Sequence, residues 1–230
     1  MIILACATQR ECSHALRRIL PEASRLPAVV HHGRHSLRVA CVGMGPVAAA
    51  LRMGEVLTRF PQATGVLHLG ICGTYDTSQA DLGQICVATS ETFPEYGVFT
   101  GDPEHQPPFT HAMLPELNLA DPRHIALDPH NAAAHLGFSI PTEWPAGPSL
   151  TVSGVSGTLQ RAQALARASA GLTENMEGFS IALAALAHGL PCVEIRTVSN
   201  VAGEQDKRYW NFSAAFHALE TIVPTLLGDM

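Results

Sequence analysis

The sequence has few charged side chains, few aromatic side chains and no long apolar run. Asp, Glu, Lys and Arg make up 15% of the 230 residues, and Phe, Trp and Tyr make up 6%. The apolar runs are about 4–8 residues long, whereas a helix that spans a membrane needs about 20. We therefore expect no membrane association. Hydrophobic residues reach 47%, which is typical of a globular chain and not of a disordered one.

Basic residues are also scarce. Lys and Arg total 14 against 20 acidic residues, and the formal net charge is −6. A chain without a basic stripe cannot displace counterions from a phosphate backbone, so we exclude nucleic acid as a partner. Residues 1–7 are apolar but lack a basic leader, which predicts a buried first strand and not a signal peptide. We expect the protein to be cytoplasmic.

No two cysteines have the spacing Cys-x-x-Cys, although the chain contains 6. Most of them lie in or beside apolar, strand-like segments, which is typical of small buried thiols in a reducing compartment. The 12 histidines include no pair at helical i, i+4 spacing with a carboxylate between them, as a zinc-binding helix would need. We therefore expect no metal.

Short apolar strands alternate with amphipathic helices along most of the chain. We predict strands at residues 2–7, 37–42, 65–70, 82–90, 150–153 and 192–199, and helices at residues 11–20, 47–60, 132–136, 159–169, 175–189 and 212–227. This alternation predicts an α/β fold in which a central mixed, mostly parallel sheet is flanked by helices. We expect one three-layer domain over residues 1–230. Residues 92–148 are rich in proline, and we expect this segment to cover the substrate or to contact another subunit.

Several residues lie at the end of a predicted strand or within a few residues after it. In open α/β sheets, ligands bind at the carboxyl ends of the strands. We therefore expect a binding site that contains Glu11, Met44, Gly70, Ile71, Cys72, Gly73, Gly154 and Asn200.

A dinucleotide-binding fingerprint is suggested by Gly43-x-Gly45-x-x-Ala48, which follows a predicted strand and opens a helix. The fingerprint also requires an acidic residue at the end of the next strand, to bind the ribose hydroxyls. Here the next strand ends in His68-Leu69-Gly70. We therefore interpret these glycines as a tight turn and expect no cofactor.

Four segments, taken in order, resemble the purine nucleoside phosphorylase and hydrolase superfamily. Residues 42–45 and 69–74 look like its two glycine turns. Residues 175–178, Asn-Met-Glu-Gly, and residues 195–202 resemble its Met-Glu and Ile-Ser-Asp/Asn segments. The resemblance extends over nearly the whole chain and is weakest in the middle. It implies a purine nucleoside substrate, cleavage of the bond between the purine and its ribose, and a homodimer or larger homo-oligomer.

Within this superfamily, three features look most like the futalosine hydrolase family, whose members release hypoxanthine in a menaquinone pathway. They are residues 174–178, residues 155–158 and the tail from Asn200 through Asp206 to Trp210. Methylthioadenosine/adenosylhomocysteine nucleosidase and another purine nucleoside hydrolase or phosphorylase remain as alternatives. A protein that binds a nucleoside as a sensor, without cleaving it, is the alternative from a different class.

The resemblance implies roles for two carboxylates. Glu11 would activate the attacking water, and Glu177 would accept hydrogen bonds from the ribose hydroxyls while Met176 packs against the sugar. Asn175, Gly154, Val155 and Ser156 would also contact the substrate. Each carboxylate also has a purely structural interpretation, because an acidic residue in the first turn of a helix is stabilised by the helix dipole.

Asn200 stands where relatives that act on adenine nucleosides carry Asp. Hypoxanthine presents an acceptor oxygen at position 6, and the two donor hydrogens of an Asn amide suit that oxygen better than a carboxyl does. A buried mismatch rejects a substrate strongly. The residue therefore favours a 6-oxopurine, although an Asn that caps a turn would look the same in the sequence.

Two further questions are the identity of the nucleophile and the residues that bind the carboxylate end of the substrate. Phosphorylases of this superfamily need arginines near the early glycine turns, and none lies there, which favours water. Futalosine carries an aromatic carboxylate, for which Lys207 and Arg208 are the candidate cations and Trp210 the candidate aromatic wall. A solvated loop is the alternative interpretation of the Lys-Arg pair.

Overall fold

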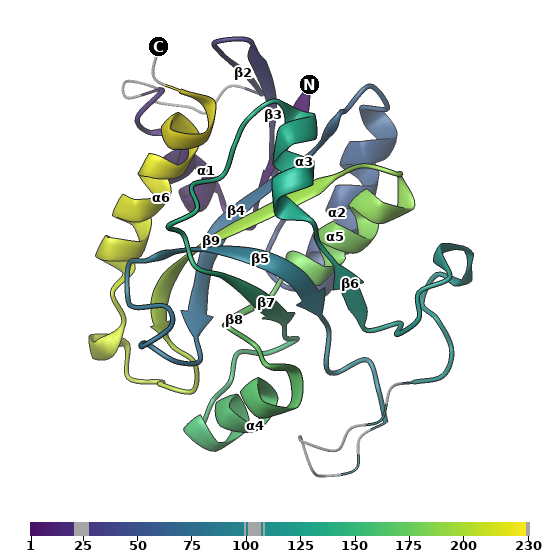
Figure 1. The fold of residues 1–230 in the computed structure, drawn as a ribbon, viewed down its shortest axis with the longest axis vertical. Helices are drawn as coiled ribbons and strands as arrows, with labels where there is room; N and C mark the ends of the chain where they lie inside the picture. The colour runs from purple at the N-terminus through teal and green to yellow at the C-terminus, as the bar shows by residue number, and fades with distance from the viewer. Residues whose placement is uncertain (21–27, 99, 101–106, 108, 229–230) are drawn as a thin grey trace.

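A nine-stranded sheet forms the centre of the molecule in a computed structural model that describes residues 1–20, 28–98, 100, 107 and 109–228 (Figure 1). The strands are β1 (Ile2–Cys6), β2 (Val29–His32), β3 (His35–Cys41), β4 (Gly65–Thr74), β5 (Ile85–Thr92), β6 (His124–Ala126), β7 (Ala146–Thr151), β8 (Thr173–Asn175) and β9 (Cys192–Val201). The helices are α1 (Gln9–Leu16), α2 (Pro46–Arg59), α3 (Pro129–Leu136), α4 (Leu159–Ser169), α5 (Gly178–Ala187) and α6 (Phe212–Leu227), with single 3-10 turns at Pro115–Leu117 and Lys207–Tyr209.

The strands follow the order β2-β3-β1-β4-β8-β7-β5-β6, and β9 pairs with both β4 and β5. Among the described strands, five pairs are parallel: β1 with β3, β1 with β4, β4 with β9, β5 with β7 and β7 with β8. Four pairs are antiparallel: β2 with β3, β4 with β8, β5 with β6 and β5 with β9. The predicted mixed α/β sheet is confirmed. Five of these pairs are parallel and four are antiparallel, a difference too small to confirm the expected mostly parallel sheet.

Five of these pairings close a ring, because β4, β8, β7, β5 and β9 each bond to the next and β9 returns to β4. The ring explains why β9 lies off the linear strand order. Its strands supply a group of buried polar side chains that bond to one another: Glu91, Ser149, Thr151, Asn175, Glu194 and Arg196. A polar core of this kind is stable only when its members are paired.

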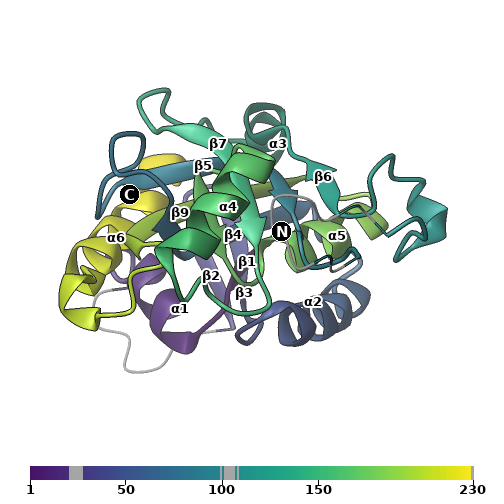
Figure 2. The same ribbon diagram turned by 90° about the horizontal axis from the view of Figure 1, so that it is seen from below.

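Helices cover both faces of the sheet. Apolar side chains of α1, α3 and α6 pack with one face, and those of α2 and α5 pack with the other. Figure 2 shows α1 beside α6 on one side and α2 beside α5 on the opposite side. In the described part of the chain, no helix combines the length and the apolar character needed to cross a bilayer.

Some sequence expectations need correction. The helix predicted at residues 175–189 begins only at Gly178, because residues 173–175 form β8 and Glu177 is the N-cap. The strand predicted at residues 65–70 continues to Thr74, so the second glycine segment is strand and not turn. Strands β2, β6 and β8 were not predicted, because each has only three or four residues and depends on its partners in the sheet.

Candidate active site

A cavity of about 430 Å³ opens where the loop after β1 meets the carboxyl-terminal halves of β4 and β9. Its wall includes Glu11, Glu177 and Asn200, which come from widely separated parts of the chain. The cavity has the size of a small-ligand site. The carboxylate in the first turn of α1 and the carboxamide near the end of β9 therefore share one cavity.

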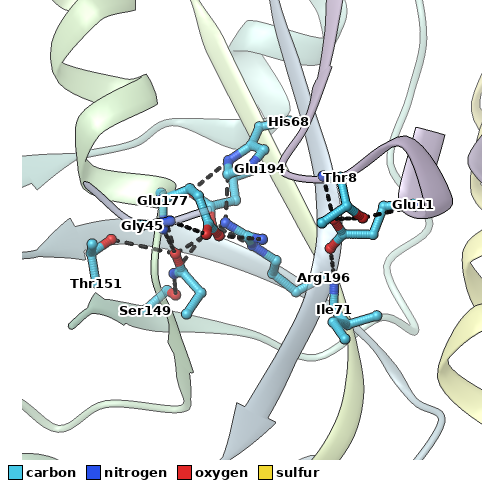
Figure 3. Close-up of polar contacts among 12 residues, drawn as sticks. Thr8, Glu11, Gly45, His68, Ile71, Ser149, Thr151, Glu177, Glu194 and Arg196 are labelled. Atoms are coloured by element: carbon cyan, nitrogen blue, oxygen red, sulfur yellow. Dashed lines mark hydrogen bonds and ion pairs between the residues drawn. The ribbon is translucent and has the colours of Figure 1, made fainter. Parts of the chain in front are cut away.

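Glu11 has a structural role as well as a place in the cavity wall. Its Oε2 accepts hydrogen bonds from Thr8 N at 2.8 Å and Thr8 Oγ1 at 2.7 Å, and the Thr8 hydroxyl caps Glu11 N at 3.1 Å (Figure 3). This capping box begins α1. The other oxygen, Oε1, accepts from Ile71 N on β4 at 3.1 Å. The side chain is thus fixed across the cavity floor and buried.

Glu177 joins the turn before α2 to the start of α5. Its Oε1 accepts a hydrogen bond from Gly45 N at 2.8 Å, at the turn that begins α2. Asn175 fixes the backbone beneath it, because Asn175 Oδ1 accepts from the N–H groups of Glu177 and Gly178 at 2.8 and 2.7 Å. Burial raises the pKa of Glu177, and the nearby Arg196 guanidinium offsets part of this effect.

Arg196 lies beneath these carboxylates and is 1% exposed. Its Nε donates to Glu194 Oε1 at 2.8 Å and its Nη2 to Asn175 Oδ1 at 3.0 Å. Burial disfavours the charge of Glu194, but the Arg196 guanidinium holds the pKa of Glu194 at about 2. In turn, burial works against the cation, but the Glu194 and Glu177 carboxylates hold the pKa of Arg196 above its usual range. The two opposite charges therefore stabilise each other inside the fold.

The amide of Asn200 has a defined orientation. Its Nδ2 donates to Val201 O at 3.0 Å, and a carbonyl can only accept, so the nitrogen must face that oxygen. Its Oδ1 lies 2.8 Å from the Ser199 hydroxyl, which can donate to it. The second hydrogen on Nδ2 remains for a ligand. The cavity wall thus presents one N–H donor at Asn200.

The far end of the cavity is aromatic and carries a cation. Trp210, Phe212 and Phe216 line it together with Arg10. The Arg10 guanidinium stacks over the Phe216 ring at 4.3 Å from its centroid, a favourable cation–π arrangement.

Comparison with known proteins identifies the family. The profile of the phosphorylase superfamily matches residues 2–224. The chain belongs to the phosphorylase superfamily. It is similar to a protein named futalosine hydrolase from Streptomyces coelicolor, at 31% identity over 98% of this chain and 94% of that one. A Thermus thermophilus protein of the same name is 32% identical over 81% of this chain and 79% of that one.

Solved structures of the superfamily share the fold. The native futalosine hydrolase of Helicobacter pylori matches with a TM-score of 0.76 and 18% identity, covering 97% of this chain and 95% of that one. The 5'-methylthioadenosine/S-adenosylhomocysteine nucleosidase of the same organism matches with a TM-score of 0.75 and 17% identity, covering 97% and 96%.

The superfamily fold brings most of the predicted site residues together. The cavity wall contains Glu11, Met44, Ile71, Cys72, Gly73, Val155, Asn175, Met176, Glu177, Asn200 and Trp210. It does not contain Gly70, Gly154, Ser156, Lys207 or Arg208. Gly70 lies directly beneath, because a Cβ there would stand 2.9 Å from Glu11 Oε1. Arg208 instead forms an ion pair with Asp206, and its side chain is 85% exposed. No described residue from 92–148 lines this cavity.

Sequence reasoning missed three charged residues of the superfamily site: Arg10, Glu174 and Arg196. Arg196 lies in β9 two residues after Glu194, and this pair of opposite charges within a strand was the available signal. Arg10 precedes Glu11 in a polar stretch and carries no distinctive pattern. Glu174 lies in the motif run itself, but its neighbours Ser156 and Tyr75 meet it only in the fold.

Proposed function

We propose that this chain hydrolyses the N-glycosidic bond of futalosine, releasing hypoxanthine and dehypoxanthine futalosine, as a step of menaquinone biosynthesis. The observation that carries the proposal is the shared cavity of Glu11, Glu177 and Asn200. The names of the relatives support the same substrate. The catalytic unit would be one domain formed by residues 1–230.

The chemistry divides among the three side chains. Glu11 takes a proton from the attacking water, as a general base. Glu177 accepts hydrogen bonds from the ribose hydroxyls, and its carboxylate stabilises the oxocarbenium-like ribosyl group in the transition state. Asn200 donates to the departing purine. Because an amide has no acidic proton to give, it stabilises the developing negative charge through hydrogen bonding, and the departing hypoxanthine anion takes its proton from water.

Arg10 is our candidate for the substrate's carboxylate, in place of Lys207 and Arg208. It lines the cavity, whereas the Lys-Arg pair does not. The rings of Trp210, Phe212 and Phe216 surround the same end. An arginine can form two parallel hydrogen bonds to a carboxylate, which adds specificity as well as affinity.

A second copy of the chain is part of the proposal. Met44, Val47 and Leu51 are 71%, 81% and 67% exposed at the start of α2. Val47 and Leu51 lie one helical turn apart and so share a face. An exposed apolar patch next to a cavity suits an interface between subunits. Light scattering of the purified protein would test the homo-oligomer, and a monomer would refute it.

We place the protein in the cytoplasm. All six cysteines are free thiols, and five of them are buried. Thiols persist in a reducing compartment. Fractionation of cells would test the assignment.

The deciding experiment measures release of free purine by chromatography. The purified protein is incubated with futalosine, inosine and methylthioadenosine, each with and without inorganic phosphate. We expect hypoxanthine from futalosine at a rate that phosphate does not change. Adenine released only from methylthioadenosine would favour the nucleosidase alternative. Dependence on phosphate would indicate a phosphorylase, and no release from any substrate would indicate a sensor.

A further inference from the structure

Glu174 is a buried carboxylate in the cavity wall to which the reaction outlined above gives no role. It lies on β8 opposite Gly73 of β4, while Asn200 of β9 lies opposite Gly73 on the other side. Direct partners in neighbouring strands point to the same face of a sheet. Glu174 and Asn200 therefore flank the glycine with their Cα atoms two strand spacings apart, about 9.6 Å.

Gly73 places no side chain of its own between these two residues. A Cβ at this position would lie 3.3 Å from Asn200 Nδ2, so the amide stands beside the place where a side chain of residue 73 would be. Two atoms of Ala202 lie 3.6 Å from the same position, so a side chain at residue 73 would crowd the Asn200 amide. The cavity of about 430 Å³ includes all three residues.

The hydrogen bonds of Glu174 fix it as an acceptor. Ser156 donates to it from its backbone N at 2.8 Å and from its hydroxyl at 2.5 Å, and the Tyr75 hydroxyl donates at 3.1 Å. Burial and the neighbouring Glu174 carboxylate raise the pKa of Tyr75, so that its hydroxyl keeps its proton. A carboxylate has about four acceptor positions, and three donors occupy three of them. One position remains for a ligand.

We propose that Glu174 accepts the N1–H of a bound 6-oxopurine, and that Glu174 and Asn200 together select hypoxanthine over adenine. This inference rests on the proposed function. Hypoxanthine carries a donor at N1 on one side of its 6-oxo group and the N7 atom on the other. The carboxylate then meets the N1–H while the Asn200 amide donates at the oxygen or at N7. Adenine has a lone pair at N1, which would face the carboxylate without a proton between them.

The test is the variant Glu174→Gln, compared on futalosine and on its 6-amino analogue. A Gln side chain can still accept from Ser156 and can donate to N1 of adenine. We expect the ratio of kcat/KM for futalosine to that for the analogue to fall at least about 100-fold, because a site built to bind one hydrogen-bond pattern rejects its opposite. Tyr75→Phe is the matched control, since it removes a hydrogen bond from Glu174 but keeps the carboxylate. An equal loss on both substrates in Glu174→Gln, or the same shift in Tyr75→Phe, would overturn the inference.

Binding of the free bases separates this inference from the proposed function. Calorimetry with hypoxanthine and with adenine needs no turnover and no particular sugar. We expect the wild type to prefer hypoxanthine and Glu174→Gln to lose that preference, whether or not futalosine is cleaved. If the wild type cleaves futalosine but Glu174→Gln keeps the preference, only the role of Glu174 fails. If that variant does not fold, Glu174→Asp can replace it. Its side chain is one carbon shorter, which moves the carboxylate away from the ligand, and we expect it to weaken the preference for hypoxanthine over adenine.

Discussion

Arg196 Nη1 lies 3.9 Å from Glu177 Oε2, with both side chains almost completely buried. Within the described part of the chain, this nitrogen makes no hydrogen bond. The other guanidinium nitrogens bind Glu194 and Asn175. One cation therefore supports a structural carboxylate and a carboxylate of the cavity at the same time. The positive charge of Arg196 therefore stabilises both the polar core of the strand ring and the carboxylate of the active site.

Arg196→Met is expected to lower the free energy of unfolding by about 3–5 kcal/mol, because it leaves buried carboxylates without their counter-charge. Urea denaturation followed by circular dichroism measures the change. Arg52→Met is the matched control, since Arg52 pairs with Glu55 on the surface at 60% and 54% exposure. Exposed pairs contribute about 0–1 kcal/mol. Equal destabilisation by the two variants would contradict the role of Arg196 in the core.

Gly70→Ala tests the close packing under the site. A Cβ at Gly70 would lie 2.5 Å from Arg196 Nη1 and 2.9 Å from Glu11 Oε1, so both side chains must move. We expect kcat for futalosine to fall about 100-fold, since displacement of about 1 Å has that cost in an active site. Gly54→Ala on α2 is the control, because a Cβ there meets nothing within 4 Å. An unchanged kcat in Gly70→Ala would show that Glu11 does not need its present position.

Regular helices were the easiest part of the fold to predict from sequence. The helices expected at residues 159–169 and 212–227 are confirmed at both ends. Both begin after a side chain that caps the helix, Thr158 and Asn211. Strand β8 could not be predicted from the sequence. Its three residues show no periodicity, and its pairing with β4 and β7 depends on distant segments of the chain.

The site was predictable where residues follow strands and not where they meet by tertiary packing. Glu11 and Asn200 follow or end strands and reach one cavity, as the strand rule suggests. Lys207 and Arg208 were chosen for their closeness to Asn200 in sequence, but Arg10 comes to the cavity from α1. Proximity along the chain is a poor guide to the far end of a pocket, because different elements supply it.

Glu11→Gln separates catalysis from capping. Gln at the third position of a helix can maintain a capping box, so the start of α1 should survive. A Gln cannot take a proton from water, and loss of a general base costs about 10²–10⁴-fold in rate. We expect kcat for futalosine to fall in that range while the melting temperature changes little. If Glu11→Gln kept its activity, Glu11 would not be the general base and would serve only to cap α1.

Arg10→Met tests the partner of the substrate's carboxylate. We expect KM for futalosine to rise about 10- to 100-fold, in line with a lost charge-assisted hydrogen bond. KM for inosine, which has no carboxylate, should stay the same. Arg208→Met is the matched control, because its ion pair with Asp206 lies outside the cavity lining. If Arg208→Met and not Arg10→Met raised KM for futalosine, the sequence-based assignment would be restored.

Glu91 predicts a pH dependence of stability. Burial and the neighbouring Glu194 carboxylate raise the pKa of Glu91 well above its ordinary value. In the unfolded chain a Glu titrates near about 4.3, so above that pH the folded state binds the extra proton. Stability contributed by this group therefore falls as the pH rises from about 4.3 toward the folded-state pKa.

Glu91→Gln removes this titration and keeps an uncharged side chain between Thr151 and Asn175, the two partners that bond to Glu91. We expect the melting temperature of the variant, relative to the wild type, to increase as the pH rises above about 4.3, where the wild type begins to lose the contribution of the protonated Glu91. Glu55→Gln on the exposed face of α2 should give a difference that is flat with pH. Because all other groups titrate equally in variant and wild type, a flat difference for Glu91→Gln would mean that Glu91 is ionised in the folded protein.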